Sequence, residues 1–230
     1  NSCGEGIASV LAVTIIPLPS LTSSSNPPAI CSGTSFRYDP YSTDTGTTFS
    51  WTRTDPTDNS IIISSGTGSI SEVLINTTNA PINVLYKYIL TNTNGCQNIQ
   101  YITVIVKPTP NLNLPTINEV ACSGNIYNYT PTFSLSGSTN TWTRVPIEGI
   151  IPVSPSGGGG SGSISETLTN TTATTIEVTY QITALASSSN GGCSKTSEIK
   201  VLVEPRPAAA GPITGATTIC QGALDQEYSV

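Results

Sequence analysis

The same series of residues occurs twice in this chain, and this internal repeat limits the fold more than any other feature. Each copy contains Cys-Ser-Gly, Trp-Thr-Arg, Gly-Ser-Ile-Ser-Glu, Asn-Thr-Thr and Gly-Cys in that order. The first cysteines, Cys31 and Cys122, are 91 positions apart (122 − 31), and the last ones, Cys96 and Cys193, are 97 apart (193 − 96). Solenoids and propellers repeat every 20 to 50 residues, roughly, so this longer period indicates a whole domain repeated in tandem.

Proline-rich segments mark the expected boundaries between the copies. They are Pro17-Leu-Pro19, Pro108-Thr-Pro110 and Pro205-Arg-Pro207. Prolines at alternate positions favour an extended, semi-rigid connection. The sequence therefore predicts two complete repeats at residues 20–109 and 110–206, with residues 1–19 ending a preceding repeat and 207–230 starting a following one. We expect an elongated array in which adjacent repeats are the nearest partners.

Composition and periodicity both indicate an all-β chain. Only 10% of the residues are charged, and histidine and methionine are absent. Apolar residues alternate from Ile82 to Leu90 and again from Ile176 to Ala184, which is the pattern of a strand with one buried face. About seven short strands per repeat and a central tryptophan are typical of an immunoglobulin-like sandwich. The residues expected in its core are Trp51, Tyr86, Trp142 and Tyr180.

The six cysteines predict a disulfide framework. The expected bonds lie within repeats and near one end of each sandwich: Cys31 with Cys96, and Cys122 with Cys193. Cys3 and Cys220 are expected to pair with cysteines outside this sequence. Such bonds persist in oxidising compartments, so they favour an extracellular protein; the alternative is two buried free thiols in each repeat. Zinc is not expected, because the chain has no Cys-x-x-Cys spacing and no histidine.

Two charged residues recur on the strand faces that carry apolar residues. Arg53 shares the phase of Trp51, and Glu72 shares the phase of Ile70 and Leu74. The second repeat has the same arrangement at Arg144 and Glu166. Since an unpaired buried charge is costly, we expect a partly buried Arg–Glu pair in each repeat. The alternative is that both side chains reach solvent at the ends of the sheets.

The residues offer little for catalysis, cofactors or nucleic acids. Without histidine there is no Ser-His-Asp or Cys-His relay, so we expect no enzyme, no metal and no cofactor. The net charge of −6 with eight Lys and Arg leaves no basic stripe for nucleic acid. No apolar run reaches the roughly 18 to 20 residues that span a bilayer, so we expect no membrane span in this segment.

Taken together, these motifs resemble the PKD-like and immunoglobulin-like repeats of giant Bacteroidetes cell-surface proteins, above all the SprB-type gliding-motility adhesins. The resemblance covers essentially the whole chain, although Trp51-Thr-Arg53 replaces the Trp-Asp-Phe-Gly-Asp of PKD domains. It implies type IX secretion, display on the outer cell surface, and a role in adhesion or gliding. The implied partners are adjacent repeats, a surface polysaccharide or substratum, and the secretion or gliding machinery of the outer membrane.

Two functions remain open from the sequence, and a third is weaker. The first is a structural stalk or spacer that carries an adhesive region elsewhere. The second is a glycan-binding repeat, for which Tyr41 and Tyr101 are the best aromatic platforms, although the second repeat has no tyrosine at either place. The third is an accessory domain of a secreted hydrolase.

Overall fold

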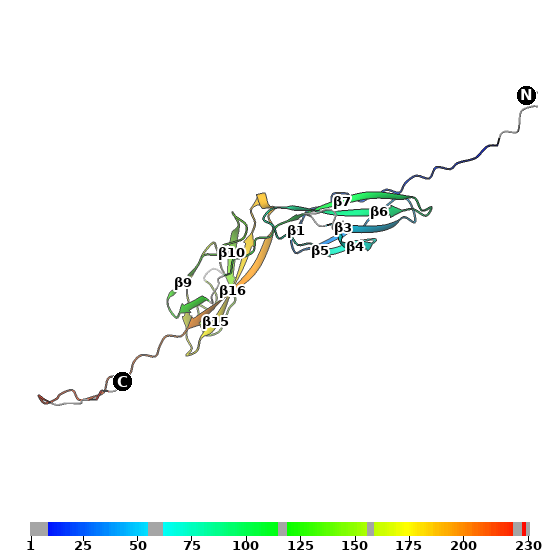
Figure 1. The fold of residues 1–230 in the computed structure, drawn as a ribbon. Helices are drawn as coiled ribbons and strands as arrows, with labels where there is room; N and C mark the ends of the chain where they lie inside the picture. The colour runs from blue at the N-terminus through cyan, green and yellow to red at the C-terminus, as the bar shows by residue number, and fades with distance from the viewer. Residues whose placement is uncertain (1–8, 55–61, 115–118, 156–158, 223–226, 229–230) are drawn as a thin grey trace, which may run out of the picture. The chain divides into compact units, whose positions relative to one another are not determined.

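The computed structural model describes residues 9–54, 62–114, 119–155, 159–222 and 227–228 (Figure 1). Apart from one short 3-10 turn at Ser188–Asn190 (η2), all regular structure in this part of the chain is β, which confirms the predicted class. The chain divides into two compact units. Unit 1 comprises Asn1–Asn111, Ser134–Ser138 and Leu185–Lys195, and unit 2 comprises Leu112–Phe133, Thr139–Ala184 and Thr196–Val230.

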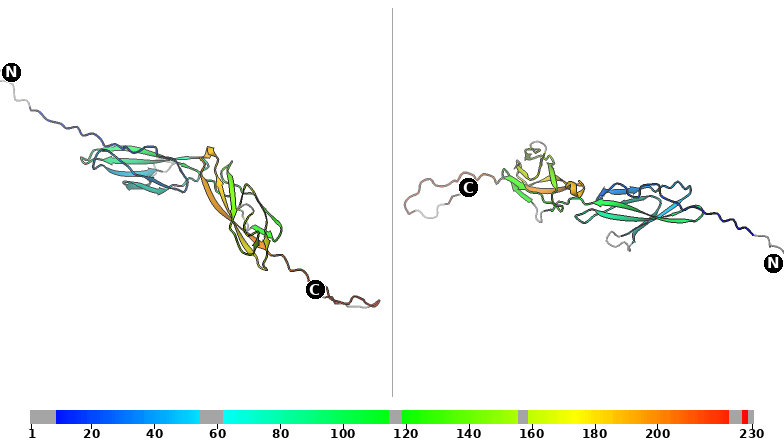
Figure 2. Two further views of the ribbon diagram at one scale, coloured as in Figure 1. Left: turned by 180° about the vertical axis from the view of Figure 1, so that it is seen from behind. Right: turned by 90° about the horizontal axis from the view of Figure 1, so that it is seen from above.

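Unit 1 contains two layers of strands (Figure 2). Its strands are β1 (Ile30–Cys31), β2 (Ser35–Tyr38), β3 (Thr48–Thr54), β4 (Ile62–Thr67), β5 (Ile70–Val73), β6 (Ile82–Thr91) and β7 (Gln97–Lys107). The larger sheet has the order β1-β7-β6-β3-β4, and β2 pairs with β5 in the other layer. Strand β1 runs parallel to β7, with Cys31 opposite Lys107, whereas β6 and β7 form an antiparallel hairpin.

Unit 2 repeats this architecture. Its strands are β8 (Glu119–Cys122), β9 (Ile126–Tyr129), β10 (Thr139–Arg144), β11 (Ile150–Ile151), β12 (Gly160–Ser161), β13 (Ile164–Thr167), β14 (Thr169–Asn170), β15 (Ile176–Leu185) and β16 (Ser194–Glu204). The main sheet has the order β12-β10-β15-β16-β8, and β9 pairs with β13. Strand β8 is parallel to β16, with Cys122 opposite Glu204. The tip of the β15–β16 hairpin, residues 185–195, clusters with unit 1, which the repeat boundaries did not predict.

Each unit has its own core, built on the alternating strand that the sequence indicated. Tyr86 on β6 and Tyr180 on β15 are fully buried. A tryptophan packs edge-on against each: Trp51 lies 5.7 Å from Tyr86 and Trp142 lies 5.8 Å from Tyr180, between ring centroids. The four expected core aromatics therefore occupy equivalent places in two separate cores.

The first glycine of each Gly-x-Gly-Ser-Ile-Ser-Glu segment is needed for this packing. A Cβ atom on Gly66 would lie 2.7 Å from the Trp51 indole, and one on Gly160 would lie 2.9 Å from that of Trp142. Both separations are shorter than van der Waals contact. The recurrence of glycine at these two positions is thus explained by the space that each tryptophan occupies.

Candidate functional site: the disulfide and the buried polar clusters

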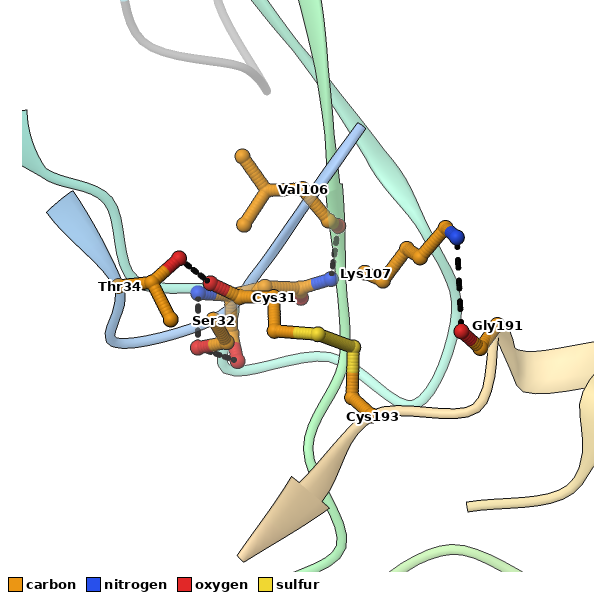
Figure 3. The surroundings of a disulfide bond; sticks show 8 residues. Cys31, Ser32, Thr34, Val106, Lys107, Gly191 and Cys193 are labelled. Carbon is orange, nitrogen blue, oxygen red and sulfur yellow. Dashed lines mark hydrogen bonds between the residues drawn. A yellow bond between two sulfur atoms is a disulfide. The ribbon is translucent and has the colours of Figure 1, made fainter. Parts of the chain in front are cut away.

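A disulfide joins Cys31 to Cys193 (Figure 3). The Cα atoms of the two cysteines are 5.8 Å apart, although 162 sequence positions separate them. Cys31 ends β1, and Cys193 follows the turn between β15 and β16, so both belong to unit 1. The bond therefore connects the first repeat defined by sequence to the hairpin tip of the second.

Hydrogen bonds hold both sides of this disulfide. The Ser32 amide donates to the Lys107 carbonyl at 2.8 Å, and the Thr34 hydroxyl donates to the Cys31 carbonyl at 2.7 Å. The Lys107 ammonium reaches across to the Gly191 carbonyl at 3.4 Å (Figure 3). Cys193 is 1% exposed, whereas Cys31 is partly exposed.

The expected pairings within repeats, Cys31 with Cys96 and Cys122 with Cys193, are wrong. Cys31 lies opposite Lys107 at the end of β7, whereas Cys96 directly precedes Gln97 at its start. An 11-residue strand is about 35 Å long, and a disulfide requires Cα atoms within about 7 Å. Strand β16 separates Cys122 from Cys193 in the same way, because Cys122 lies opposite Glu204.

The sequence contained one signal against the expected pairing. Cys96 and Cys193 follow turn glycines at hairpin tips, whereas Cys31 and Cys122 lie about a dozen residues after the Pro-x-Pro segments. A first strand that runs parallel to the last strand places the first cysteine at the end remote from the tip. The parallel pairing of β1 with β7 has no signal of its own in the residue order.

Three other cysteines of the described residues are free. Cys122 and Cys220 are exposed and Cys96 is partly exposed. Cys3, which was expected to pair beyond this sequence, lies outside the described residues.

In unit 1, Glu72 is the centre of a partly buried polar cluster. Arg53 Nε donates to Glu72 Oε2 at 2.9 Å, and Tyr86 Oη donates to the same oxygen at 2.6 Å. The Ser64 hydroxyl donates to Oε1. Burial alone would raise the pKa of Glu72, but the hydrogen bonds from Ser64 and Tyr86 and the charge of Arg53 together lower it below the ordinary value of 4.5. Burial, reinforced by the bond to Glu72, raises the pKa of Tyr86.

The equivalent cluster in unit 2 is more deeply buried. Arg144 Nε donates to Glu166 Oε2 at 3.0 Å, and Tyr180 Oη donates to that oxygen at 2.7 Å. The other guanidinium nitrogens of Arg144 donate to the carbonyls of Pro152 and Val153, at 2.6 and 3.2 Å. The Arg144 side chain is 0% exposed, against 18% for Arg53. Both expected Arg–Glu pairs are thus present, and the surrounding tyrosines and carbonyls satisfy their hydrogen bonds.

The recurring Asn-Thr-Thr segments are structural turns, each held by a buried asparagine side chain. Asn170 Nδ2 donates to the Thr174 and Val203 carbonyls at 2.7 and 2.9 Å, while Oδ1 accepts from the amide and hydroxyl of Thr172. Asn76 makes the same four bonds in unit 1. These turns fasten the segment before β6 or β15 to the end of β7 or β16. The repetition is visible in the sequence, but this role depends on contacts between segments far apart in the chain.

The PKD-like domain family matches the chain twice, over residues 28–110 and 119–207. The chain belongs to this family. No curated protein sequence matches it. PKD-like domains are typical of extracellular proteins, and the disulfide agrees with such a location. They typically have no catalytic role.

The chain is also similar to solved structures, among them the following three. The IG1+IG2 fragment of DIP-gamma is 11% identical over 83% of this chain and 99% of that one, with a TM-score of 0.36. The fibronectin(III)-like modules of Clostridium thermocellum CbhA are 15% identical over 82% and 95%, with a TM-score of 0.27. Bacteroides ovatus SGBP-B, solved with a mixed-linkage heptasaccharide, is 12% identical over 81% and 48%, with a TM-score of 0.30.

The two PKD-like repeats show no cluster of three or more His, Cys, Asp or Glu residues suited to a metal ion, within the part of the chain that the structure describes. In the same residues, no helix is long and apolar enough to cross a bilayer.

Replacing Asn170 by Ala is expected to destabilise the second PKD-like repeat by about 3 kcal/mol, because the buried Val203 carbonyl and the partly buried Thr174 carbonyl and Thr172 amide lose their partner. Chemical denaturation followed by tryptophan fluorescence measures the change. Asn128 on β9 is exposed and begins another Asn-x-Thr segment, so Asn128→Ala is the matched control and should cost little. Equal losses in both variants would contradict the structural role of Asn170.

Glu72 is expected to make the first PKD-like repeat sensitive to acid. Its folded-state pKa is lowered, so its contribution to stability is present above the ordinary pKa of 4.5 and is lost as the pH falls through the folded value. Glu72→Gln should therefore be less stable than wild type at about pH 6, and the difference should shrink at about pH 3. Urea unfolding at several pH values measures this, with the exposed Glu148→Gln as control. A difference independent of pH would refute the assignment.

Proposed function

We propose that this chain is a structural spacer segment of a large bacterial cell-surface adhesin. The observation that carries the proposal is the disulfide between Cys31, in the first PKD-like match, and Cys193, in the second. The two repeats are thus joined covalently twice, once by the Pro108–Pro110 linker and once by this disulfide. A covalently reinforced tandem of folded domains suits a stalk that transmits force.

The buried clusters support the same function. In each repeat an arginine, a glutamate and a tyrosine form hydrogen bonds with one another. These groups therefore stabilise the fold and are not presented to a substrate. Sequence resemblance supports the finer proposal of an SprB-type adhesin of the Bacteroidetes, exported by type IX secretion, displayed on the outer cell surface and acting in gliding motility. We place the repeats of the array at residues 20–109 and 110–206, between the end of one neighbour (1–19) and the start of another (207–230).

The spacer function predicts that length grows with the number of repeats. Chains with one, two and three copies of residues 20–206 are compared by small-angle scattering in oxidising buffer. A spacer gives equal increments in maximum dimension for each added copy. A maximum dimension that grows only as the cube root of the mass would indicate that the repeats collapse on one another, and it would overturn the proposal.

Glycan binding is the second candidate, favoured by a groove of about 330 Å³ in unit 1 beside Tyr101. Leu21, Ser23, Ser25 and Gln100 complete its lining. Tyr101 is 52% exposed, as an aromatic platform for a sugar ring requires.

A glycan array separates the two functions. Specific binding by wild type that is lost in Tyr101→Ala, with an unchanged unfolding transition, would establish recognition. Tyr41, which is 63% exposed and donates its amide to the Ser23 hydroxyl, supplies the second variant, Tyr41→Ala. Uniform background signal for all three proteins is expected of the spacer.

A further inference from the structure

We propose that Cys122 and Cys96 are two halves of the same kind of bond that joins Cys31 to Cys193, and that each pairs with a cysteine in a neighbouring copy of the repeat. Cys122 would bond to the hairpin-tip cysteine of the following repeat, and Cys96 to the first cysteine of the preceding one. This inference rests on the proposed repeat array. It yields a continuous series of disulfides in which every Pro-x-Pro linker is bridged.

The surroundings of Cys122 match those of the bonded Cys31. The following serine amide donates to the last-strand carbonyl in both repeats, from Ser32 to Lys107 at 2.8 Å and from Ser123 to Glu204 at 3.0 Å. The serine hydroxyl then donates to the carbonyl of Asn76 or Asn170, at 3.2 and 3.3 Å. Cys122 is therefore fixed at the end of its sheet as Cys31 is, with its side chain exposed and unbonded.

The surroundings of Cys96 likewise match those of the bonded Cys193. Each cysteine carbonyl accepts a hydrogen bond across the hairpin tip, from Asn92 at 3.1 Å and from Ala186 at 2.8 Å. Cys96 and Cys193 each directly precede an 11-residue strand, β7 or β16. Their difference lies in the partner: Cys193 has one and Cys96 does not.

The linker before the first repeat already lies against the hairpin that carries Cys96. Asn92 Nδ2 donates to the Pro17 carbonyl at 3.3 Å, and Asn98 Nδ2 donates to the Pro19 carbonyl at 2.8 Å. Beside the Cys193 hairpin, Lys195 Nζ donates to Asn111 Oδ1 at 2.6 Å, just after the next linker. A chain that enters through Pro17–Pro19 thus follows the same course past Cys96 that Pro108–Asn111 follows past Cys193.

Bond formation requires an oxidant, for which a low-molecular-weight disulfide such as oxidised glutathione suffices. The Cys122 thiolate attacks one glutathione sulfur and forms a mixed disulfide, releasing one glutathione thiolate. The Cys96 thiolate of the next copy then attacks the Cys122 sulfur and releases the second glutathione thiolate. Two cysteine thiols are oxidised to one disulfide, and one glutathione disulfide is reduced to two glutathione thiols, which take up the two protons that the cysteines lose.

The test is a tandem chain in which residues 1–207 are followed directly by residues 20–230, so that the third Pro-x-Pro segment, Pro205-Arg-Pro207, leads into a new first repeat. It is refolded in a glutathione redox buffer, and the monomeric fraction is mapped by peptide mass spectrometry. We expect a Cys31–Cys193 bond in each copy and one bond between Cys122 of the first copy and Cys96 of the second. Each bond lowers the mass by about 2 Da through loss of two hydrogens.

Serine variants in single copies provide matched controls. Cys96→Ser in the second copy should abolish the new bond, whereas Cys96→Ser in the first copy should leave it intact. The proposal would be overturned if both variants kept the bond. It would also be overturned if Cys122 were free in a tandem chain that retains both Cys31–Cys193 bonds. The scattering increments test the spacer separately, so they can fail while the bond forms, and the reverse.

Discussion

Reducing the Cys31–Cys193 bond is expected to lengthen the chain under tension by about 530 to 580 Å. Force applied at the two ends passes from Cys31 to Cys193 through the sulfur atoms, so the intervening backbone cannot be extended while the bond is intact. The bond spans 162 positions, and an extended chain measures about 3.3 to 3.6 Å per residue. While the bond is intact, the residues between Cys31 and Cys193 therefore carry no force, even when both repeats are unfolded.

An optical trap with handles at both ends measures this change with and without reducing agent. Cys31→Ser in oxidising buffer should give the same final length as the reduced wild type. Cys122→Ser is the control and should leave the oxidised length unchanged, because Cys122 is free among the residues that the structure describes. Lengthening by Cys122→Ser would instead indicate a bond between Cys122 and Cys193 and would refute the connectivity.

Replacing Arg144 by Ala is expected to destabilise the second repeat by about 3 to 5 kcal/mol. The variant leaves the Glu166 carboxylate, whose side chain is 9% exposed, without its positive partner. It also removes the donors to the Pro152 and Val153 carbonyls. Loss of one partner from a buried ion pair is costly because the remaining charge stays desolvated.

Denaturant unfolding in a Trp51→Phe background measures the effect, since Trp142 then reports on the second repeat alone. Arg53→Ala, read through Trp51 in a Trp142→Phe background, is the matched comparison and should cost less, because the Arg53 side chain is 18% exposed. A double variant, Arg144→Met with Glu166→Leu, should recover part of the loss because no charge remains unpaired. Equal costs for Arg144→Ala and Arg53→Ala would contradict the importance of burial.

Much of the architecture could be predicted because it depends on local patterns. Alternation along β6 and β15 set the buried face, and that face placed Tyr86 and Tyr180 in the cores. The same phase argument brought Arg53 to Glu72 and Arg144 to Glu166, since a charge among inward-facing residues requires a partner. The tyrosine hydroxyls that complete these clusters could not be predicted, because their reach depends on how the two layers pack.

The sequence by itself determined that this chain is a tandem of all-β domains, because hydrophobic alternation and repetition are properties of residue order. Only the tertiary structure decided the disulfide. Every repeat carries the same two cysteines, so residue order permits pairing within or between repeats. The decision lies in the parallel pairing of β1 with β7, which separates Cys31 from Cys96 by the length of a strand and leaves it beside Cys193.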